Sequence, residues 1–202
     1  MFKKLHIILF TLCSLGFKGL AQKDTATFNP KQELVYDGKR YRVYNNWLSF
    51  GGGAGYNTSW IKDEKNLGLD YSFHIKKTYY RVGAFMSGRN FTESNNYNFH
   101  AAIGLRKEHT KYNLSAFAGP SSAYFKRPLK DSVNYNLKSV YNELGLYACL
   151  EAVYKIKYDV GLGGQIFCDY NRVQLVYGVR LIAYFSGAYR GIKYGYKAPS
   201  KK

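Results

Sequence analysis

Apolar and polar residues alternate along most of the chain after Trp47. In the last such stretch, Val179 and Leu181 take one parity, whereas Gly178 and Arg180 take the other. A period of two is the signature of β-strands that have one apolar face. The pattern predicts eight strands, at residues 46–56, 66–75, 78–88, 97–107, 111–121, 138–154, 158–168 and 172–186.

The connections between these predicted strands differ in length in a regular way. Every second connection is a tight polar turn, and the others are longer polar loops except for the last, 169–171, which is short. Short turns at one end and long loops at the other are typical of outer-membrane barrels. The tight turns are expected at 76–77, 108–110 and 155–157, and the longer loops at 57–65, 88–96 and 122–137.

A closed eight-stranded barrel could be soluble, with its apolar face inward, or could cross a membrane, with its apolar face outward. No Lys, Arg, Asp or Glu occupies the apolar parity inside any predicted strand, and the other parity is rich in glycine and small residues. A charge that faces the middle of a bilayer costs about 2–4 kcal/mol. We therefore predict an all-β fold, an eight-stranded antiparallel up-and-down transmembrane β-barrel over residues 46–186.

The first residues carry the features of an export signal. Lys3 and Lys4 precede an apolar run over 5–17, and small residues around Ala21 close the segment. The apolar run is too short to span a bilayer as a helix. The pattern therefore predicts a secretory signal peptide over residues 1–21, cut after Ala21. A retained N-terminal anchor is the alternative.

Two segments flank the predicted barrel. Residues 22–45 are predicted to form a periplasmic N-terminal arm with a short hairpin, because Asp37-Gly38 suits a type I′ turn between two β-prone stretches. A flexible arm is the alternative, since isolated hairpins are marginally stable. Residues 187–202 are predicted to form a basic periplasmic tail. Both segments are assigned to the periplasm because an even number of strands returns the chain to the side on which it entered.

These features resemble the small eight-stranded outer-membrane barrels of the OmpA/OmpX type. The resemblance rests on the alternation, the asymmetry between turns and loops, and the aromatic strand ends. The tail after Phe185 departs from the usual form, and the resemblance transfers no function. The Ala21-Gln22 junction and the Tyr-rich strands resemble proteins from Bacteroidota. The last strand resembles the C-terminal signal read by the barrel-insertion machinery, at Gly178, Leu181, Ala183 and Phe185.

Two cysteines follow the predicted signal peptide, Cys149 and Cys168. They fall in different predicted strands, on opposite faces and at different heights, so their Cα atoms should lie too far apart for a disulfide. An exported protein without a disulfide needs another source of stability, and a closed barrel in lipid can supply it.

Charged residues also occur on the inward parity of the predicted strands. Counting from the tight turns places four of them at similar heights and the fifth, Glu143, nearer the outer mouth. An unpaired charge there would be costly, so we predict a lumenal salt-bridge cluster that acts as a structural plug. A gate or a proton path is the functional alternative. The predicted cluster comprises Asp70, Arg81, Glu143, Glu151 and Arg180.

Some barrels of this size are enzymes that modify lipid A. A deacylase resembles a His/Ser nucleophile system and must present it to lipid, yet His74 and His100 fall on the inward parity and His109 lies in a turn. An acyl-transferring barrel needs an apolar lumen, whereas the lumen predicted here is charged. No metal-ligand spacing or phosphate-cradling glycine motif stands out. We therefore expect no catalytic residues, no metal and no cofactor.

The positive charge is unevenly distributed. The chain carries a net charge of +17, and loss of Lys3, Lys4 and Lys18 with the signal peptide lowers this to +14. Most of the excess falls on the predicted periplasmic side, so nucleic acid is not an expected partner. This side would meet anionic phospholipid head groups or an acidic periplasmic protein. The predicted basic periplasmic rim comprises Lys76, Lys77, Arg106, Lys107, Lys111, Lys155 and Lys157.

We interpret the protein as a non-enzymatic outer-membrane barrel that acts by contact. It would be either a structural membrane protein or a subunit of a larger envelope complex. Its partners would be outer-membrane lipid and possible periplasmic or outer-membrane proteins. A lipid A-modifying enzyme and a narrow pore are the alternatives. The predicted outer contact, in the loop over 122–137, comprises Tyr124, Phe125, Lys126 and Arg127.

Overall fold

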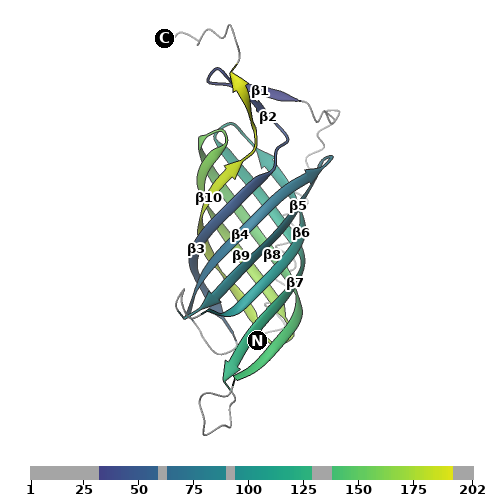
Figure 1. Cartoon of the computed structure of the whole chain (residues 1–202), viewed down its shortest axis with the longest axis vertical. Helices are drawn as coiled ribbons and strands as arrows, with labels where there is room; N and C mark the ends of the chain where they lie inside the picture. Colours follow the sequence, from purple (N-terminus) through teal and green to yellow (C-terminus); the bar gives the residue numbers. More distant parts are fainter. Residues whose placement is uncertain (1–31, 59–62, 90–93, 129–137, 193–202) are drawn as a thin grey trace, which may run out of the picture.

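The computed structural model describes residues 32–58, 63–89, 94–128 and 138–192. The predicted signal peptide and residues 193–202 of the tail lie outside the described residues. Eight strands form a closed antiparallel barrel in the order β10-β3-β4-β5-β6-β7-β8-β9 (Figure 1), which confirms the predicted fold class. The barrel strands are β3 (Trp47–Asn57), β4 (Asp63–Ile75), β5 (Thr78–Gly88), β6 (Ser94–Glu108), β7 (Tyr112–Pro128), β8 (Lys138–Lys157), β9 (Val160–Asn171) and β10 (Leu175–Ser186).

Beyond one end of the barrel lies a second, three-stranded sheet, which we call the platform (top of Figure 1). It consists of β1 (Glu33–Tyr36), β2 (Lys39–Arg42) and β11 (Tyr189–Ile192), with β2 in the middle. Asp37 and Gly38 both have positive φ, at 49° and 70°, as a type I′ turn requires. The hairpin β1–β2 therefore has the turn that its sequence indicates, and the first residues of the tail supply its third strand.

The connections at the platform end are short, but two of them lie at other residues than predicted. β6 continues to Glu108, so its turn is formed by 109–111 instead of 108–110. The turn between β4 and β5 is Lys76-Lys77, as predicted. The predicted turn at 155–157 is wrong, because β8 continues to Lys157 and the turn is formed by Tyr158 and Asp159. Tyr158 packs there against Tyr41 of β2, with ring centroids 4.6 Å apart, so it lies under the platform.

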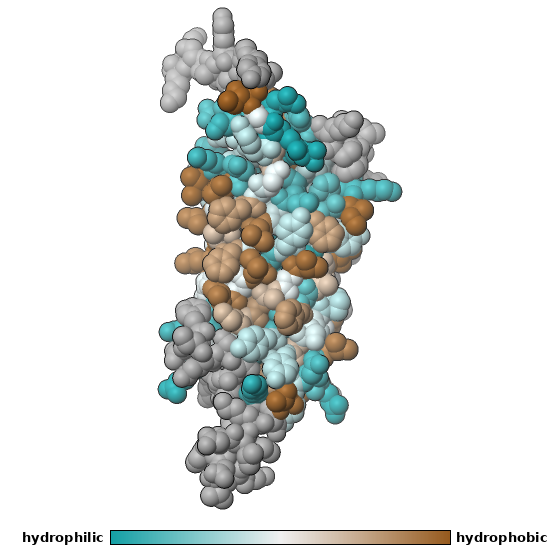
Figure 2. All heavy atoms as spheres, viewed as in Figure 1, coloured by the Kyte–Doolittle hydropathy of each residue, from teal (hydrophilic) through white to brown (hydrophobic). Residues whose placement is uncertain are grey.

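The outer surface of the barrel is apolar around its middle. Figure 2 shows a brown, hydrophobic belt with hydrophilic residues concentrated towards both ends. Leu181 and Leu144 are 80% and 82% exposed, whereas the lumenal Arg81 is 0% exposed. Among the described residues, no helix is long and apolar enough to cross a membrane. The predicted parity, apolar outward and polar inward, is the parity that the structure has.

The two cysteines lie on opposite faces of the barrel wall, as predicted. Cys149 is buried on the lumenal side, Cys168 is partly exposed on the outer side, and neither forms a disulfide. Their predicted difference in height is wrong, because Cys168 pairs directly with Ala148, the residue before Cys149. Opposite side-chain directions alone therefore keep the two thiols apart.

Candidate functional site: a filled lumen and a basic platform end

The centre of the lumen holds a buried arginine between two carboxylates. Nη2 of Arg81 on β5 lies 2.7 Å from Oε2 of Glu151 on β8, and Nη1 lies 3.6 Å from Oδ2 of Asp70 on β4. The exposure of these three side chains does not exceed 3%. The structure thus brings together three of the five residues that we expected to form the lumenal charge cluster.

Both carboxylates have further hydrogen-bond partners. Glu151 accepts hydrogen bonds from the indole Nε1 of Trp47 and from the hydroxyl of Ser49, each at 3.2 Å. Asp70 lies 2.9 Å from Nε2 of His100. A buried charge is tolerated when it is paired and hydrogen-bonded. The carboxylates of this cluster meet that condition.

Arg180 on β10 lies beside these residues but bonds to amides instead of a carboxylate. It donates from Nε to Oδ1 of Asn66 at 2.7 Å and from Nη1 to Oε1 of Gln165 at 3.0 Å. Gln165 in turn donates to Asp70 at 2.8 Å, so one amide links Arg180 to the carboxylate. The guanidinium carbon of Arg180 also lies 3.8 Å from the ring centroid of Phe167. We call the linked set the central cluster: Asp70, Arg81, His100, Glu151, Gln165 and Arg180.

Glu143, the remaining predicted member, lies apart from the central cluster. It is partly exposed, and its register partner is Ala123 on β7. In the part of the chain that the structure describes, it makes no salt bridge. Glu143 precedes Glu151 by eight positions on β8, which is about 26 Å along an extended strand. It is therefore too far along the barrel to join the cluster.

Inward-facing glycines leave the space that the central cluster occupies. A Cβ on Gly83 would overlap Oδ1 of Asp70 and the imidazole of His100. A Cβ on Gly68 would overlap the guanidinium of Arg180. The small residues on the inward parity therefore make room for long charged side chains in a narrow barrel.

A second charged layer closes the lumen nearer the platform. Glu108 pairs with Arg106, Nη1 to Oε2 at 3.0 Å, and with the ammonium group of Lys155. Arg106 also donates from Nη2 to the hydroxyl of Tyr184 at 2.8 Å. The side chains of Arg106 and Lys155 are wholly buried. Their placement in an exposed basic rim was wrong, because both keep the inward parity of their strands. The other predicted rim residues are exposed: Lys76, Lys77, Lys107, Lys111 and Lys157.

A third polar layer lies towards the opposite end of the barrel, where the sequence predicts a loop. Glu64 accepts hydrogen bonds from Nδ2 of Asn57 at 3.0 Å and from the hydroxyl of Ser87 at 2.6 Å. Asn57 also bonds to Oε1 of Gln174 at 3.0 Å. Glu64 was assigned to a loop over 57–65, whereas β4 begins at Asp63. Extending the alternation of β4 by two residues would have placed it inside the lumen.

The predicted outer contact is not a loop. β7 and β8 stay paired past the rest of the barrel, up to Pro128 opposite Lys138, so the first seven residues of the predicted loop belong to β7. Phe125 is buried and stacks on Tyr141, its register partner on β8, at 5.2 Å between ring centroids. This cross-strand stacking supports a two-stranded extension. Four residues move from loop to strand: Tyr124, Phe125, Lys126 and Arg127, of which Tyr124 and Lys126 are exposed.

The filled lumen leads to a first prediction, on conductance. Three layers of bonded side chains, centred on Glu108, Arg81 and Glu64, lie along the barrel. An eight-stranded barrel has an interior that its own side chains just fill. The purified protein should therefore give no conductance steps above leak in planar bilayers, with a pore-forming barrel as the positive control. Reproducible ohmic steps would show that the lumen opens.

The histidines of the described residues lie in the lumen or at the platform end of the barrel. His100 is buried in the lumen between Asp70 and the ring of Tyr147, which stacks on it at a centroid distance of 3.7 Å. His74 lies at the platform end of β4, and His109 lies in the turn after β6. Besides its charged layers, the lumen is occupied by buried aromatic side chains that include Phe85, Phe117 and Phe167. The described residues contain no group of His, Cys, Asp and Glu side chains able to hold a metal ion.

A closed antiparallel barrel with an apolar outer belt and with its charged side chains buried in the lumen is the architecture of a transmembrane β-barrel. Solved structures share this fold. Neisserial surface protein A (NspA) is 11% identical, with a TM-score of 0.55 over 69% of this chain and 96% of that chain. The N-terminal β-barrel domain of Pseudomonas aeruginosa OprF is 7% identical, with a TM-score of 0.51 over 70% and 98%.

No protein-family model and no curated protein sequence matches the chain. The structural likeness, at these low identities, establishes the fold and leaves activity open. The fold is that of the OmpA/OmpX type, as the sequence resemblance implied. The two solved structures come from Neisseria and Pseudomonas, so they give no support to an origin in Bacteroidota.

Proposed function

We propose that this protein resides in the outer membrane, with the platform in the periplasm, and acts by contact without catalysing a reaction. It serves either as a structural membrane protein or as a subunit of a larger envelope complex. The observation that carries this proposal is the contrast between a lumen filled by bonded side chains and a folded sheet beyond the barrel. A filled lumen disfavours a pore and an acyl pocket, which leaves the surfaces outside the lipid.

The platform offers an edge strand as a contact surface. β1 is an outer strand of the three-stranded sheet, and its Val35 and Tyr36 are each 37% exposed. Edge strands present backbone N–H and C=O groups that can pair with an incoming strand. Arg40 pairs with Glu33 across this hairpin at 2.7 Å, and its hydrogen bond lowers the pKa of the Glu33 carboxyl below its ordinary value. Glu33 is therefore ionised and already engaged at neutral pH.

The exposed lysines around the platform define the chemistry of a partner. Lys76 and Lys77 lie in the turn after β4, and Lys111 lies before β7. Together with the platform arginines, they form a basic surface just outside the hydrophobic belt. Such a surface fits anionic phospholipid head groups and an acidic periplasmic protein. Nucleic acid is not a partner in this proposal, since the charge faces the periplasm.

Site-specific photocrosslinking in living cells tests this proposal. A photoreactive phenylalanine analogue at Val35 should give one adduct of defined mass if the platform contacts a protein. The matched control is the analogue at Leu144, on the outer face of the barrel, which should label lipid only. A Val35 adduct supports a complex subunit, and its absence supports a structural role. An altered acyl pattern of lipid A after deletion of the gene would overturn both and favour an enzyme.

A further inference from the structure

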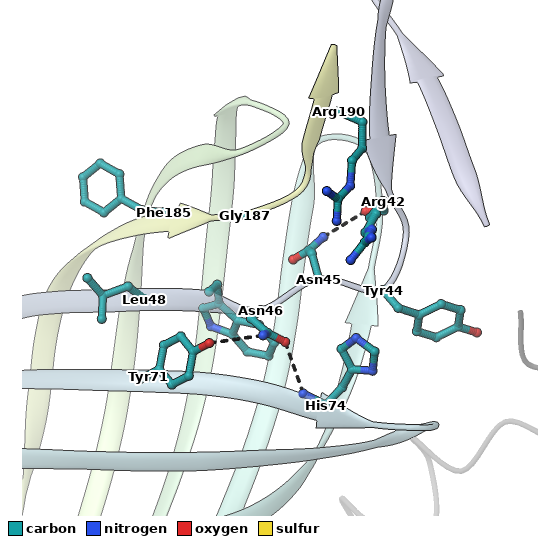
Figure 3. A pocket seen from close by; sticks show the side chains of 11 residues that line it. Arg42, Tyr44, Asn45, Asn46, Leu48, Tyr71, His74, Phe185, Gly187 and Arg190 are labelled. Atoms are coloured by element: carbon teal, nitrogen blue, oxygen red, sulfur yellow. Dashed lines mark hydrogen bonds between the residues drawn. The ribbon is translucent and has the colours of Figure 1, made fainter. Parts of the chain in front are cut away.

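A cavity of about 380 Å³ lies between the platform and the barrel (Figure 3). Its size is in the range of small-ligand sites. It is bounded by the ends of β3, β4 and β10 on the barrel side and by residues of β2 and β11 on the platform side. The two sides differ in chemistry, and this difference points to the ligand.

The barrel side of the cavity is a row of three apolar side chains. Leu48 on β3 is the direct register partner of Phe185 on β10 and of Tyr71 on β4. Their exposures are 37%, 48% and 43%, so all three are accessible on the outer face of the wall. They continue the hydrophobic belt to its limit at the platform end. The cavity therefore opens onto the surface that acyl chains cover.

The platform side presents two arginines. Figure 3 shows Arg42 of β2 and Arg190 of β11 side by side above Asn45. Arg190 is the extra residue of a β-bulge, because Tyr189 pairs with Tyr41 and Gly191 pairs with the next residue, Arg40. Gly191 has a φ of 126°, a conformation that glycine adopts readily. A bulge re-aims the side chain that it carries, here an arginine at the cavity.

The charge of the cavity is positive. The eleven residues that line it include two arginines and no carboxylate. Glu33, the acidic residue of the adjoining β1, pairs with Arg40 and also lies near Arg42 and Arg190, whose charges help to lower the pKa of its carboxyl. On the barrel side of the cavity, Asn46 links two residues of β4. It donates a hydrogen bond to the hydroxyl of Tyr71 at 3.1 Å and accepts one from the backbone N–H of His74 at 3.4 Å. These hydrogen bonds fix Asn46 to β4 on the side of the cavity opposite the two guanidinium groups.

We propose that this cavity is a binding site for an anionic phospholipid of the inner leaflet. Arg42 and Arg190 bind its phosphate, and its acyl chains lie along Phe185, Leu48 and Tyr71. Arginine suits phosphate because its planar fork donates two parallel hydrogen bonds. A free phosphate would contact only the arginines. A phospholipid would contact the arginines through its phosphate and the three apolar side chains through its acyl chains. The site rests on the membrane placement proposed above, but it does not depend on any protein partner.

Titration of the purified full-length protein with a soluble short-chain phosphatidylglycerol, followed by native mass spectrometry, tests the site. The variant Arg42→Gln/Arg190→Gln should bind this lipid about thirtyfold more weakly, at about 1 kcal/mol for each arginine. The matched control Arg89→Gln/Arg172→Gln removes the same charge from exposed positions at the end of the barrel away from the platform and should bind like the wild type. Circular dichroism checks that both variants fold.

Three results would overturn the proposal. One is equal loss of affinity in the Arg89→Gln/Arg172→Gln control, which would indicate a general attraction of the lipid to positive charge on the protein. A second is equal affinity of all three proteins for the lipid. A third is displacement of phosphatidylglycerol by inorganic phosphate at the same concentration, which would assign the site to free phosphate. None of these results bears on the photocrosslink at Val35, so the two proposals can fail separately.

Discussion

Replacing Arg81 by methionine is expected to lower the free energy of unfolding of the barrel by about 3–5 kcal/mol. The guanidinium of Arg81 lies 2.7 Å from Glu151 and 3.6 Å from Asp70, and both carboxylates are buried. Removing one partner of a buried ion pair leaves an uncompensated charge, and that loss exceeds the net contribution of the pair itself. Methionine keeps much of the volume of the side chain, so a cavity contributes little to the effect.

The measurement is equilibrium urea unfolding of the refolded protein in phospholipid vesicles. The matched control is Lys77→Met, which removes a charge from an exposed turn and should change the free energy of unfolding by less than about 0.5 kcal/mol. The double variant Arg81→Met/Glu151→Gln should recover part of the loss, because it removes the unpaired charge as well. A single Arg81→Met variant that unfolds like the wild type would exclude a stabilising central cluster.

The barrel could be predicted from the sequence because its wall has two chemically different sides. Lipid requires apolar residues at every second position, and the lumen requires small or paired polar residues at the positions between. This constraint applies to every strand. The alternation therefore predicts both that Leu181 faces outward and that Arg180 faces the lumen. It also placed Asp70, Arg81 and Glu151 at one height, since counting from the short turns fixes how far along the barrel each residue lies.

The ends of the strands could not be predicted in the same way. Outside the hydrocarbon, alternation is no longer required, so the two-stranded extension of β7 and β8 to Pro128 resembled a loop. Arg106 and Lys155 were assigned to the rim because they lie close to turns, although their parity points inward. β11 is four residues long, and its pairing with β2 includes a β-bulge that the sequence pattern does not predict.

The partners within the lumen also depend on geometry that the alternation does not contain. The alternation indicates whether a side chain faces the lumen or the lipid, and counting from the turns indicates roughly how far along the barrel it lies. Neither indicates which strands face one another across a closed barrel. Arg81 and Glu151 lie on β5 and β8, which are not neighbours. Arg180 was expected to meet a carboxylate, and it instead bonds to the amides of Asn66 and Gln165.

A large loss of stability is also expected when a charge is placed on the outer face of the barrel. Tyr177, Leu181 and Phe185 lie on the outer face of β10 at steps of four residues, and Leu181 is 80% exposed at the middle of the belt. Substitution of Leu181 by arginine is expected to cost about 2–4 kcal/mol, because the charge would face the middle of the hydrocarbon. The same substitution at Tyr177, near the edge of the belt, should cost about 0–1 kcal/mol.

The unfolding free energies of Leu181→Arg and Tyr177→Arg in phospholipid vesicles therefore test most directly whether the barrel spans a membrane. Leu181→Ala serves as the control for loss of the side chain and should be milder than Leu181→Arg. If the barrel spans a membrane, arginine at Leu181 should be more destabilising than arginine at Tyr177 by about 2 kcal/mol or more. Equal unfolding free energies for the two arginine variants would contradict it, because an arginine on a water-facing wall would be tolerated equally at both positions.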